Sequence, residues 1–353
     1  MPEKVKLGFV GCGFMGQCVH LPSFQRAENA EIVAITDLRP RLAKAVADRW
    51  KIRRVYPSHH EMVEDEEIDA IVEITNKFAH AQTAIDALEA GKHVFTEKPI
   101  ATNAKDAEEM VKKAQKHDRK LMVGYMKRYD TGVLKAKEVF REFAEKDKVT
   151  YARSHLFGGD WICGPTAERR IETGEPYPRI EPRFPNSLPE ELVRTMDNLL
   201  EQVHDINLPR YFMGDPAAVE LSRLWPGGFI SVLDYGDYPL VLEMGSMTAD
   251  FWEEQLMIYF RDGWINLRPA APLLRNVPAK VKIYRAGKVQ RDEALHGAWS
   301  WAFERQAQHF VDCIVENREP ISSGADSYKD IVIIESILKS AVEGRKVKLK
   351  LGL

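Results

Sequence analysis

Three glycines near the N-terminus are spaced as in a turn that holds a dinucleotide. An apolar run over residues 5–10 leads into Gly11-Cys12-Gly13-Phe14-Met15-Gly16, and a helix-compatible segment follows. Gly11 permits the tight turn, Gly13 lets the backbone approach a pyrophosphate, and Gly16 lets helix and strand pack closely. Free N–H groups at the start of the helix attract the phosphates. The residues of this turn that we expect to contact the dinucleotide are Gly11, Gly13, Phe14, Met15 and Gly16.

An acidic residue follows the next apolar run, where a ribose-binding carboxylate belongs. The run over residues 32–35 ends in Thr36-Asp37, and a carboxylate there accepts hydrogen bonds from ribose hydroxyls. The strand before the glycines and the acid after the second strand make the motif more specific than a glycine turn alone. The Asp37 charge would repel a 2′-phosphate, which favours NAD over NADP. Arg39 and Arg41 lie just beyond it and could offset that charge, so NADP remains the alternative.

Lys98 is the first candidate for the chemical step. It lies in Thr96-Glu97-Lys98-Pro99, directly after an apolar run that we expect to form a strand. An ammonium there would lie beside the nicotinamide, where it could hold a substrate hydroxyl or share its proton as hydride leaves the carbon. A solvated surface charge is the other interpretation of such a lysine. Pro99 fixes the adjacent backbone, which favours a held side chain.

Residues 5–125 alternate between segments typical of strands and of helices. The expected strands cover residues 5–10, 32–35, 55–56, 69–75, 93–96 and 120–125, with helical segments between most of them. Repeated βα units predict a parallel, doubly wound sheet, and ligands bind such sheets at the carboxyl ends of the strands. Those ends carry the glycine turn, Asp37, Thr75-Asn76, Glu97-Lys98 and Lys127-Arg128.

The pattern changes in the second part of the chain. Residues 157–189 are rich in glycine, proline and charge and predict a long surface excursion, and residues 189–212 predict one helix. Strand-like runs separated by turns follow over residues 218–284, which is typical of an antiparallel sheet. We therefore expect a Rossmann domain over residues 1–126 and an α+β domain with a mainly antiparallel open sheet over residues 127–353. The C-terminal helix of the second domain could pack back on the first.

Composition narrows the class of protein. The chain has 353 residues, 44% hydrophobic and 29% charged, which suits a globular protein of two domains. A net charge of −3 argues against nucleic acid or an anionic membrane as the main partner. The 4 cysteines form no CxxC pair, so a reducing compartment is expected. No apolar stretch is long enough to span a membrane, and the first strand begins too early for a secretory signal, so we expect a cytoplasmic protein.

One stretch resembles the signature of the glucose-fructose oxidoreductase/inositol dehydrogenase/rhizopine-catabolism family. It reads His80-Ala81…Ala84…Ala87-Leu88…Ala90-Gly91-Lys92-His93-Val94…Glu97-Lys98-Pro99. The next strand and turn of that family, especially of its inositol dehydrogenases, are similar to Val123-Gly124-Tyr125-Met126-Lys127-Arg128-Tyr129-Asp130. The C-terminal part also fits, with Phe303…Phe310…Ile314…Pro320 and then Ser336…Ala341…Gly344…Val347. The resemblance spans essentially the whole chain.

The resemblance implies NAD(P)-dependent oxidation or reduction of a sugar, cyclitol or related polyol. In this family the lysine of Glu-Lys-Pro and a helix histidine act at the reacting hydroxyl, often with a nearby carboxylate. The open face of the second sheet commonly forms a dimer or tetramer interface, so a homodimer or homotetramer is expected. Beside the glycine turn and Asp37, further cofactor contacts are expected at Arg39, Thr75, Asn76, His80, Glu97 and Lys98.

His204 fits the family histidine, and its ordinary pKa suits proton transfer near neutrality. The family often places a carboxylate four residues earlier, where this chain has Leu200. On one continuous helix Asp197, Glu201 and His204 would share a face. Glu201 is therefore the candidate that orients His204, raising its pKa, and Asp197 is the alternative.

Two further departures from the family pattern concern polar residues near these positions. Asn207 replaces an acid that is common in the family. Thr75-Asn76-Lys77 stands where a Thr-Pro-Asn-like turn is usual, so cofactor contacts at this turn are expected to differ.

Other side chains suit a polyol. Lys127 matches a substrate-side position of inositol dehydrogenase-like members. His155 ends the strand expected to roof the site, and Asp160-Trp161 follows, where the carboxylate would take hydroxyls and the ring would cover C–H faces. A solvated loop lysine and plain loop structure are the alternatives. The candidate substrate contacts are Lys98, Lys127, His155, Asp160, Trp161 and His204.

The sequence thus predicts an NAD-dependent dehydrogenase in which Lys98 and His204 handle the hydroxyl proton, without a metal. Two alternatives stay open. The protein could hold NAD tightly and use transient oxidation for elimination or glycosidic cleavage, or it could be a cofactor-dependent sensor without catalysis. The retained Lys98 and His204 count against the sensor.

Overall fold

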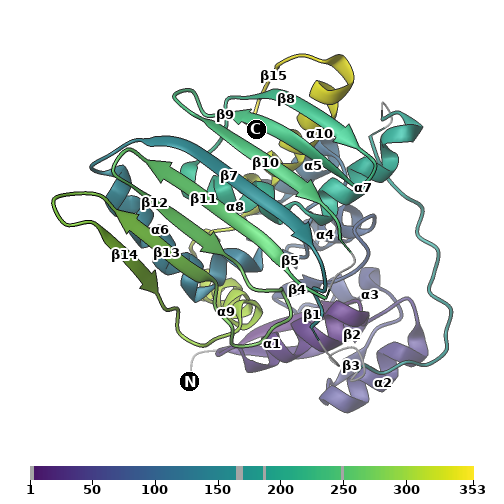
Figure 1. The fold of residues 1–353 in the computed structure, drawn as a ribbon. Coiled ribbons are helices and arrows are strands. Elements are labelled where there is room, and N and C mark those ends of the chain that lie inside the picture. Colours follow the sequence, from purple (N-terminus) through teal and green to yellow (C-terminus); the bar gives the residue numbers. More distant parts are fainter. Residues whose placement is uncertain (1–3, 164–169, 186–187, 248–249) are drawn as a thin grey trace.

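Two sheets organise the chain in the computed structural model (Figure 1). The structure describes residues 4–163, 170–185, 188–247 and 250–353. A 6-stranded sheet is built before residue 124, and a 9-stranded sheet uses strands from residue 149 onward. The predicted fold class, a Rossmann domain followed by an α+β part with a mainly antiparallel sheet, is confirmed. We propose that the boundary between the two domains lies between residues 126 and 127.

The first sheet is parallel and doubly wound. Its strands are β1 (Val5–Val10), β2 (Ala30–Thr36), β3 (Arg54–Val55), β4 (Ala70–Glu73), β5 (His93–Thr96) and β6 (Leu121–Val123). Their order in space is β3-β2-β1-β4-β5-β6, so the connection reverses direction between β1 and β4. Ligands bind at this switch point in sheets of this kind. The helical elements between the strands are η1 (Gly16–His20), α1 (Leu21–Arg26), α2 (Pro40–Trp50), α3 (His59–Val63), α4 (His80–Glu89) and α5 (Ala104–Lys116).

Local sequence explains where several of these helices begin. Ser58 caps α3 by accepting a hydrogen bond from the Glu61 N–H, and Asn103 caps α5 by accepting one from the Asp106 N–H. Pro40 occupies the first turn of α2, where its missing N–H costs nothing. The strands of β1 and β4 are buried almost throughout, because helices cover both faces of the sheet.

The second sheet is antiparallel except at one pair. Its strands are β7 (Val149–Gly158), β8 (Ala218–Trp225), β9 (Gly228–Asp234), β10 (Pro239–Gly245), β11 (Glu253–Phe260), β12 (Gly263–Arg268), β13 (Lys280–Arg285), β14 (Arg291–Leu295) and β15 (Val347–Lys348). Their order is β14-β13-β12-β11-β7-β10-β9-β8-β15, and only β7 and β10 pair in parallel. Helix α6 (Thr131–Ala144) packs on one face through Val133 and Phe140. The other face is turned toward the viewer in Figure 1 and carries no described helix.

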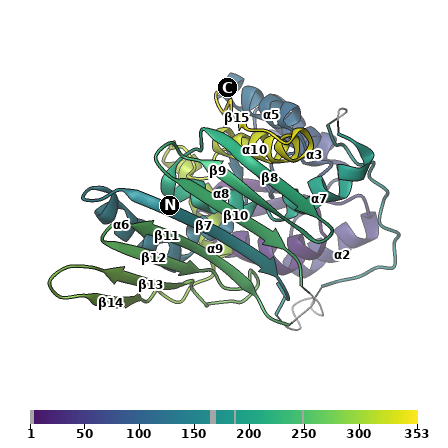
Figure 2. The ribbon, with the colours of Figure 1, turned by 45° about the horizontal axis from the view of Figure 1, so that its top comes forward.

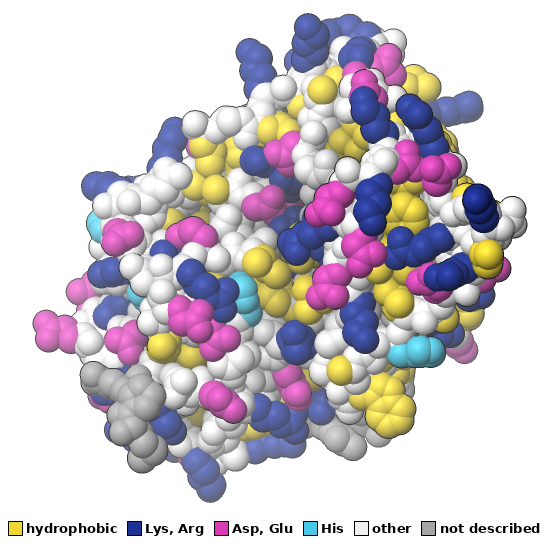
Figure 3. Space-filling model, turned by 90° about the vertical axis from the view of Figure 1, so that its left-hand side faces the viewer, with side chains coloured by type: hydrophobic (Ala, Val, Ile, Leu, Met, Phe, Trp, Pro, Cys, Tyr) yellow, Lys and Arg dark blue, Asp and Glu magenta, His cyan; other side chains and the backbone are white. Residues whose placement is uncertain are grey.

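The last two helices connect the two sheets. Helix α9 (Ala302–Val315) contacts α1, and α10 (Gly324–Glu343) contacts both α5 and β8. Figure 2 shows α10 between the second sheet and α5. Within the described residues, none of the helices combines the length and the apolar character needed to cross a membrane. Basic and acidic side chains are interspersed over the face shown in Figure 3.

The predicted single helix over residues 189–212 is divided. The structure has η4 (Glu190–Leu192), α7 (Val193–Glu201) and α8 (His204–Met213), and Gln202 leaves the helical conformation with φ −95° and ψ 15°. Glu201 is therefore the last residue of one helix, and His204 is the first residue of the next. The shared helical face expected for Asp197, Glu201 and His204 does not form.

The predicted surface excursion contacts the first domain along much of its length. We call residues 170–185 the strap, which descends along the right side of Figure 1 toward α2. Gln17 exchanges two hydrogen bonds with the backbone of Ile171. Glu175 accepts hydrogen bonds from the Arg41 and Leu42 N–H groups at the start of α2, at 3.0 and 2.9 Å. Further along, the Phe184 ring meets the Phe78 ring edge-on at 5.2 Å.

His93 at the start of β5 makes the stability of this domain sensitive to acid. Burial, followed by the charges of Arg119 and Lys120, lowers the pKa of His93 to about 4. Its Nδ1 also accepts a hydrogen bond from the Lys120 N–H, which requires a neutral ring. The unfolded chain, with an ordinary histidine pKa, therefore binds more protons between about pH 6.5 and 4, and this contribution to stability is lost as pH falls through that window.

We expect this one group to lower the free energy of unfolding by about 1–2 kcal/mol between pH 7 and pH 5. Denaturant unfolding of wild type and His93→Asn at both pH values measures the difference, since asparagine keeps an acceptor but does not titrate. An equal loss of stability in both proteins would exclude His93 as a source of the acid sensitivity.

Candidate active site

A cavity of about 940 Å³ lies at the carboxyl ends of the first-sheet strands and reaches the second sheet. Most of the predicted site residues meet in it. Those that line the cavity are Gly11, Gly13, Phe14, Met15, Asp37, Arg39, Thr75, Asn76, His80, Glu97, Lys98, Lys127, Trp161, Glu201 and His204. His155, Asp160 and the buried Gly16 are not part of this lining.

The glycine turn has the shape that a pyrophosphate needs. Gly11 has φ +99°, and a Cβ added to it would lie 2.2 Å from the Ile74 carbonyl oxygen. A Cβ on Gly16 would lie 2.5 Å from the Gly11 carbonyl oxygen. Beside Gly13 no atom lies within 4 Å, so this glycine leaves open space where the backbone borders the cavity. These residues fit a bound dinucleotide.

Asp37 holds both the glycine turn and a neighbouring arginine. It accepts a hydrogen bond from the Cys12 N–H at 2.7 Å. The Arg39 guanidinium donates to its two oxygens, from Nε at 2.8 Å and from Nη2 at 3.1 Å. The Tyr177 ring of the strap lies 5.1 Å from the same guanidinium. The end of the cavity expected for the adenosine ribose is thus bordered by an ion pair and by the strap.

The loop after β5 is held from two sides. His80 Nδ1–H donates to the Pro99 carbonyl at 2.8 Å. Glu97 accepts from His20 Nε2–H at 2.7 Å and from the Lys98 N–H at 2.9 Å. His80 and Glu97 were predicted to contact the cofactor, and in this structure their hydrogen bonds fix the backbone on either side of Lys98. At the end of β4, Thr75 donates from its N–H and hydroxyl to the buried Glu73.

Glu201 contacts Lys98. The contact with His204 that the sequence predicted does not form. The Lys98 ammonium donates to Glu201 twice, to Oε2 and to the backbone oxygen, both at 3.0 Å. The other carboxylate oxygen of Glu201 meets the Lys77 ammonium, which also pairs with Asp197 at 2.8 Å. Partial burial raises the pKa of Glu201, but Lys98 and Lys77 outweigh it and lower this pKa to about 2. Because the helix breaks after Glu201, the carboxylate turns toward the lysines.

His204 is buried at the start of α8, with its ring edge-on to Tyr125 at 5.7 Å. Its Nδ1 has no hydrogen-bond partner among the described residues. Burial, and then the charges of Lys127 and Lys98, hold the pKa of His204 well below its ordinary value. The expected increase of this pKa by Glu201 is therefore wrong in direction, and the lowered pKa favours the neutral imidazole, the form that can accept a proton.

Lys127 belongs to a buried charged group that the sequence did not suggest as a unit. Its ammonium lies 2.5 Å from Glu254 of β11 and 3.6 Å from Asp205, and all three side chains are buried. Trp252 donates from Nε1 to Glu254 at 3.0 Å and lines the cavity. Burial is the main cause that raises the pKa of Asp205 to about 8. The charge of Lys127 opposes this increase, and the charge of Glu254 adds to it.

Asp205 could have been noticed, because it directly follows His204 in the sequence. Glu254 gave no such signal. It lies in a strand whose side chains alternate between the two faces of the sheet, and the pairing register decides which face Glu254 takes. Lys77 was noted only as a departure from the family turn.

Two predicted substrate contacts are directed elsewhere. His155 lies 2.9 Å from Glu243 on the neighbouring strand β10 and stacks on Phe157 at 4.9 Å. Asp160 accepts hydrogen bonds from the Ile162 and Cys163 N–H groups, so its carboxylate closes its own turn. Trp161 does line the cavity and meets the Phe14 ring edge-on at 5.8 Å.

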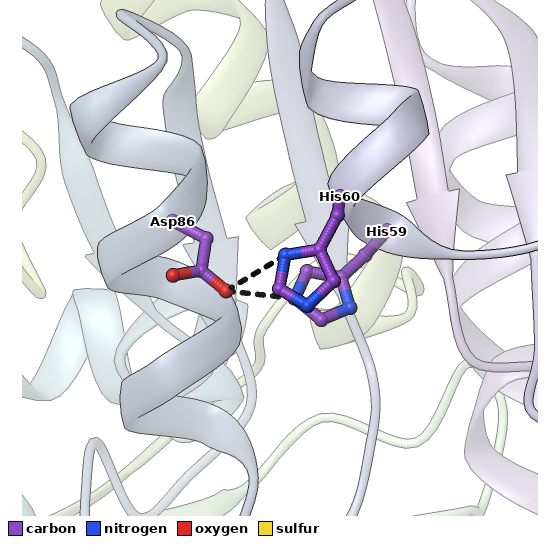
Figure 4. Close-up of side chains that lie close together, drawn as sticks. All are labelled: His59, His60 and Asp86. Atoms are coloured by element: carbon purple, nitrogen blue, oxygen red, sulfur yellow. Dashed lines mark hydrogen bonds and ion pairs between the residues drawn. The ribbon is translucent and has the colours of Figure 1, made fainter.

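His59, His60 and Asp86 form a cluster (Figure 4), and the two histidines also line the cavity. Asp86 Oδ2 lies 2.8 Å from His59 Nε2 and 3.5 Å from His60 Nδ1. The two imidazole rings are 3.9 Å apart. Their potential ligand atoms all lie within 4.8 Å of one another, as a metal site would require. A carboxylate that pairs with two histidines accounts for the same arrangement without a metal. The predicted reaction without a metal stays a prediction.

A Rossmann sheet with a glycine turn, an acid after β2 and a lysine and histidine in the same cavity define an oxidoreductase that uses a nicotinamide dinucleotide. Known proteins place the chain more closely. The family described as oxidoreductase family, NAD-binding Rossmann fold, matches residues 5–125. The inositol 2-dehydrogenase/D-chiro-inositol 3-dehydrogenase of Shouchella clausii is 34% identical over 363 residues, which cover 98% of this chain and 94% of the relative. The chain belongs to this oxidoreductase family, whose Rossmann fold is NAD-binding, and the predicted resemblance is confirmed.

Other relatives are more distant but similar in length. The enzyme of the same name from Halalkalibacterium halodurans is 26% identical over 364 residues, 97% of this chain and 92% of the relative. The fold is similar to that of an aldose-aldose oxidoreductase from Caulobacter crescentus, with a TM-score of 0.77, 23% identity and coverage of 98% and 100% of the two chains. An NAD-binding oxidoreductase from Klebsiella pneumoniae gives a TM-score of 0.80 at 16% identity, with 99% of each chain covered.

Proposed function

We propose that this protein is an NAD-dependent dehydrogenase that acts on a hydroxyl-bearing carbon of a cyclitol, a sugar or a related polyol. The observation that carries the proposal is that Lys98 and His204 line the same cavity as the glycine turn. Relatives named inositol 2-dehydrogenase align with almost the whole chain and support a cyclitol as the first substrate class to test.

The chain's own residues supply the proton chemistry, and bound NAD would supply a nicotinamide carbon that accepts or returns hydride. An ammonium has three N–H groups, and Lys98 donates to two acceptors on Glu201. The third N–H is left for the substrate oxygen, where it stabilises developing negative charge. His204 is neutral for the reason given above, so it can take the hydroxyl proton as hydride leaves the carbon.

The group around Lys127 suits the other hydroxyls of a polyol. Lys127, Asp205 and Glu254 are buried, and Lys127 and Trp252 line the cavity. The Lys127 ammonium lies 5.9 Å from the centre of the Trp252 ring. We therefore place substrate recognition at Lys127 and Trp252, and withdraw His155 and Asp160 as substrate contacts.

The function is tested by mixing the protein and NAD with a panel of cyclitols and sugars and following NADH absorbance. We expect net NADH with at least one compound. Product formation without net NADH would favour transient oxidation with retained cofactor. Absence of any product, from protein that binds NAD, would contradict the proposal and favour a sensor.

We expect NAD to be preferred over NADP, and Asp37→Ser to narrow the ratio of their kcat/KM values by about tenfold or more. Asp37 would repel a 2′-phosphate, and its removal also frees the Arg39 guanidinium that it holds at 2.8 Å. The measurement is kcat/KM with each cofactor for wild type and variant. When Arg39→Gln is added to Asp37→Ser, part of the preference for NAD over NADP should return, because the freed guanidinium is then absent. A wild-type preference for NADP would refute this prediction.

We also propose that the protein is a cytoplasmic homodimer or homotetramer that associates through the open face of the second sheet. This face carries aromatic side chains, including Tyr259 and the stacked pair Trp264 and Tyr284, whose rings are 6.0 Å apart. Sedimentation equilibrium of wild type and Trp264→Glu tests the interface. An unchanged oligomer in the variant would place the interface elsewhere.

A further inference from the structure

Lys77 joins the two domains beside the proposed proton-transfer residues. It follows β4 in the first domain, and its ammonium pairs with Asp197 and Glu201, both on α7 of the second. Its side chain is 13% exposed, whereas those of Asp197 and Glu201 are 40% and 53% exposed. The lysine is therefore mostly shielded from solvent, while the two acids remain partly exposed.

The charges form a continuous chain from Asp197 to Lys98. Asp197 pairs with Lys77, Lys77 pairs with one oxygen of Glu201, and the other oxygen of Glu201 accepts a hydrogen bond from Lys98. Burial lowers the pKa of Lys77, but its hydrogen bonds to Asp197 and Glu201 outweigh this and raise it. Lys77 is thus a permanent cation at neutral pH.

We propose that Lys77 is a positioning residue that fixes the Glu201 carboxylate so that Glu201 can aim the Lys98 ammonium at the substrate oxygen. The proposal rests on the proposed function of Lys98. Glu201 is the last residue of α7, and its side chain is half exposed, so without Lys77 its carboxylate is free to turn into water. Lys98 would then keep only the backbone oxygen of Glu201 as a fixed acceptor.

Kinetics of Lys77→Met are the first test. We expect kcat to fall by about 10- to 100-fold, the size typical of a misplaced reacting group, while KM for the polyol and Kd for NAD stay within severalfold. Lys77→Arg should retain most of the activity, because a guanidinium can pair with both acids. Lys112→Met is the matched control, since Lys112 pairs with Glu108 at 2.7 Å on an exposed helix face.

A double mutant separates action through Glu201 from an independent role. If Lys77 acts through Glu201, Lys77→Met should have little further effect in a Glu201→Gln background. If the loss of kcat in the double mutant equalled the product of the two single losses, the proposal would be overturned. A large increase in Kd for NAD with unchanged kcat would also overturn it, because Lys77 would then be a cofactor contact.

A measurement without turnover distinguishes this proposal from the proposed function. Acetic anhydride is added to the cofactor-free protein, and the acetylation rate of each lysine is followed by mass spectrometry. We expect Lys98 to react severalfold faster in Lys77→Met and in Glu201→Gln, by similar factors, and at the wild-type rate in Lys112→Met. An unchanged Lys98 rate in Lys77→Met would refute the positioning role, even if the wild type oxidised none of the polyols tested.

Discussion

Replacing His204 by asparagine is expected to lower kcat by about 10²- to 10⁴-fold, the range for loss of a general base. The ring is buried in the cavity and is kept neutral by burial and by Lys127 and Lys98, so it can accept the hydroxyl proton. Asparagine has a similar polar outline but cannot take up this proton. Steady-state kinetics with the best polyol give kcat, and calorimetric titration gives Kd for NAD, which should remain within severalfold.

Lys98→Met should cause a loss of the same order, because the N–H left for the substrate oxygen disappears. If the two residues act on one hydroxyl as a unit, the double mutant should lose much less than the product of the single losses. Near-normal turnover of either single variant would remove that residue from the mechanism. Tyr125, which meets the His204 ring edge-on, provides a packing control as Tyr125→Phe.

Alanine at Gly11 and at Gly13 should damage the protein in different ways. Gly11 has φ +99°, and its added Cβ would collide with the Ile74 carbonyl. We expect Gly11→Ala to lower the free energy of unfolding of the cofactor-free protein by about 2 kcal/mol or more, because both the backbone conformation and the contact become strained. Thermal and denaturant unfolding without NAD measure this loss.

Gly13→Ala should leave that stability unchanged, because nothing lies within 4 Å of the new Cβ. Its methyl group would instead occupy space beside the cavity where a pyrophosphate approaches the backbone. We therefore expect Kd for NAD to rise about tenfold or more, in keeping with the close approach that this motif requires. If Gly13→Ala bound NAD normally, the position assigned to the pyrophosphate would be incorrect.

The first domain was predictable because its signals are local. The glycine turn, the Ser58 and Asn103 caps and the buried apolar runs each specify a short segment, and together they specify a parallel sheet. The alternating strands from Ala218 onward were predicted for the same reason, with ends within a few residues of those observed. The edge strand β14 was missed, because three of its five residues are charged and the apolar alternation of a strand is absent.

The partners of the site residues could not be predicted, because they depend on long-range placement. No glycine or proline marks the helix break at Gln202, and this break directs Glu201 to Lys98 and Lys77. Glu254 meets Lys127 only because β11 pairs with β7 in one register. His155 was expected to face the substrate from the strand end, but its cross-strand neighbour Glu243 holds it.

The strap has a kinetic consequence for the cofactor. It is attached to the first domain near the glycine turn through Gln17, at the start of α2 through Glu175, and at Phe78 through Phe184. Between these attachments, Tyr177 borders the cavity beside Arg39. Release of a dinucleotide lying under the strap would be slowed if several of these contacts had to separate first. Cofactor exchange would then wait for local unfolding of the strap, and the rate of that opening would set an upper limit on turnover whenever each cycle requires fresh NAD.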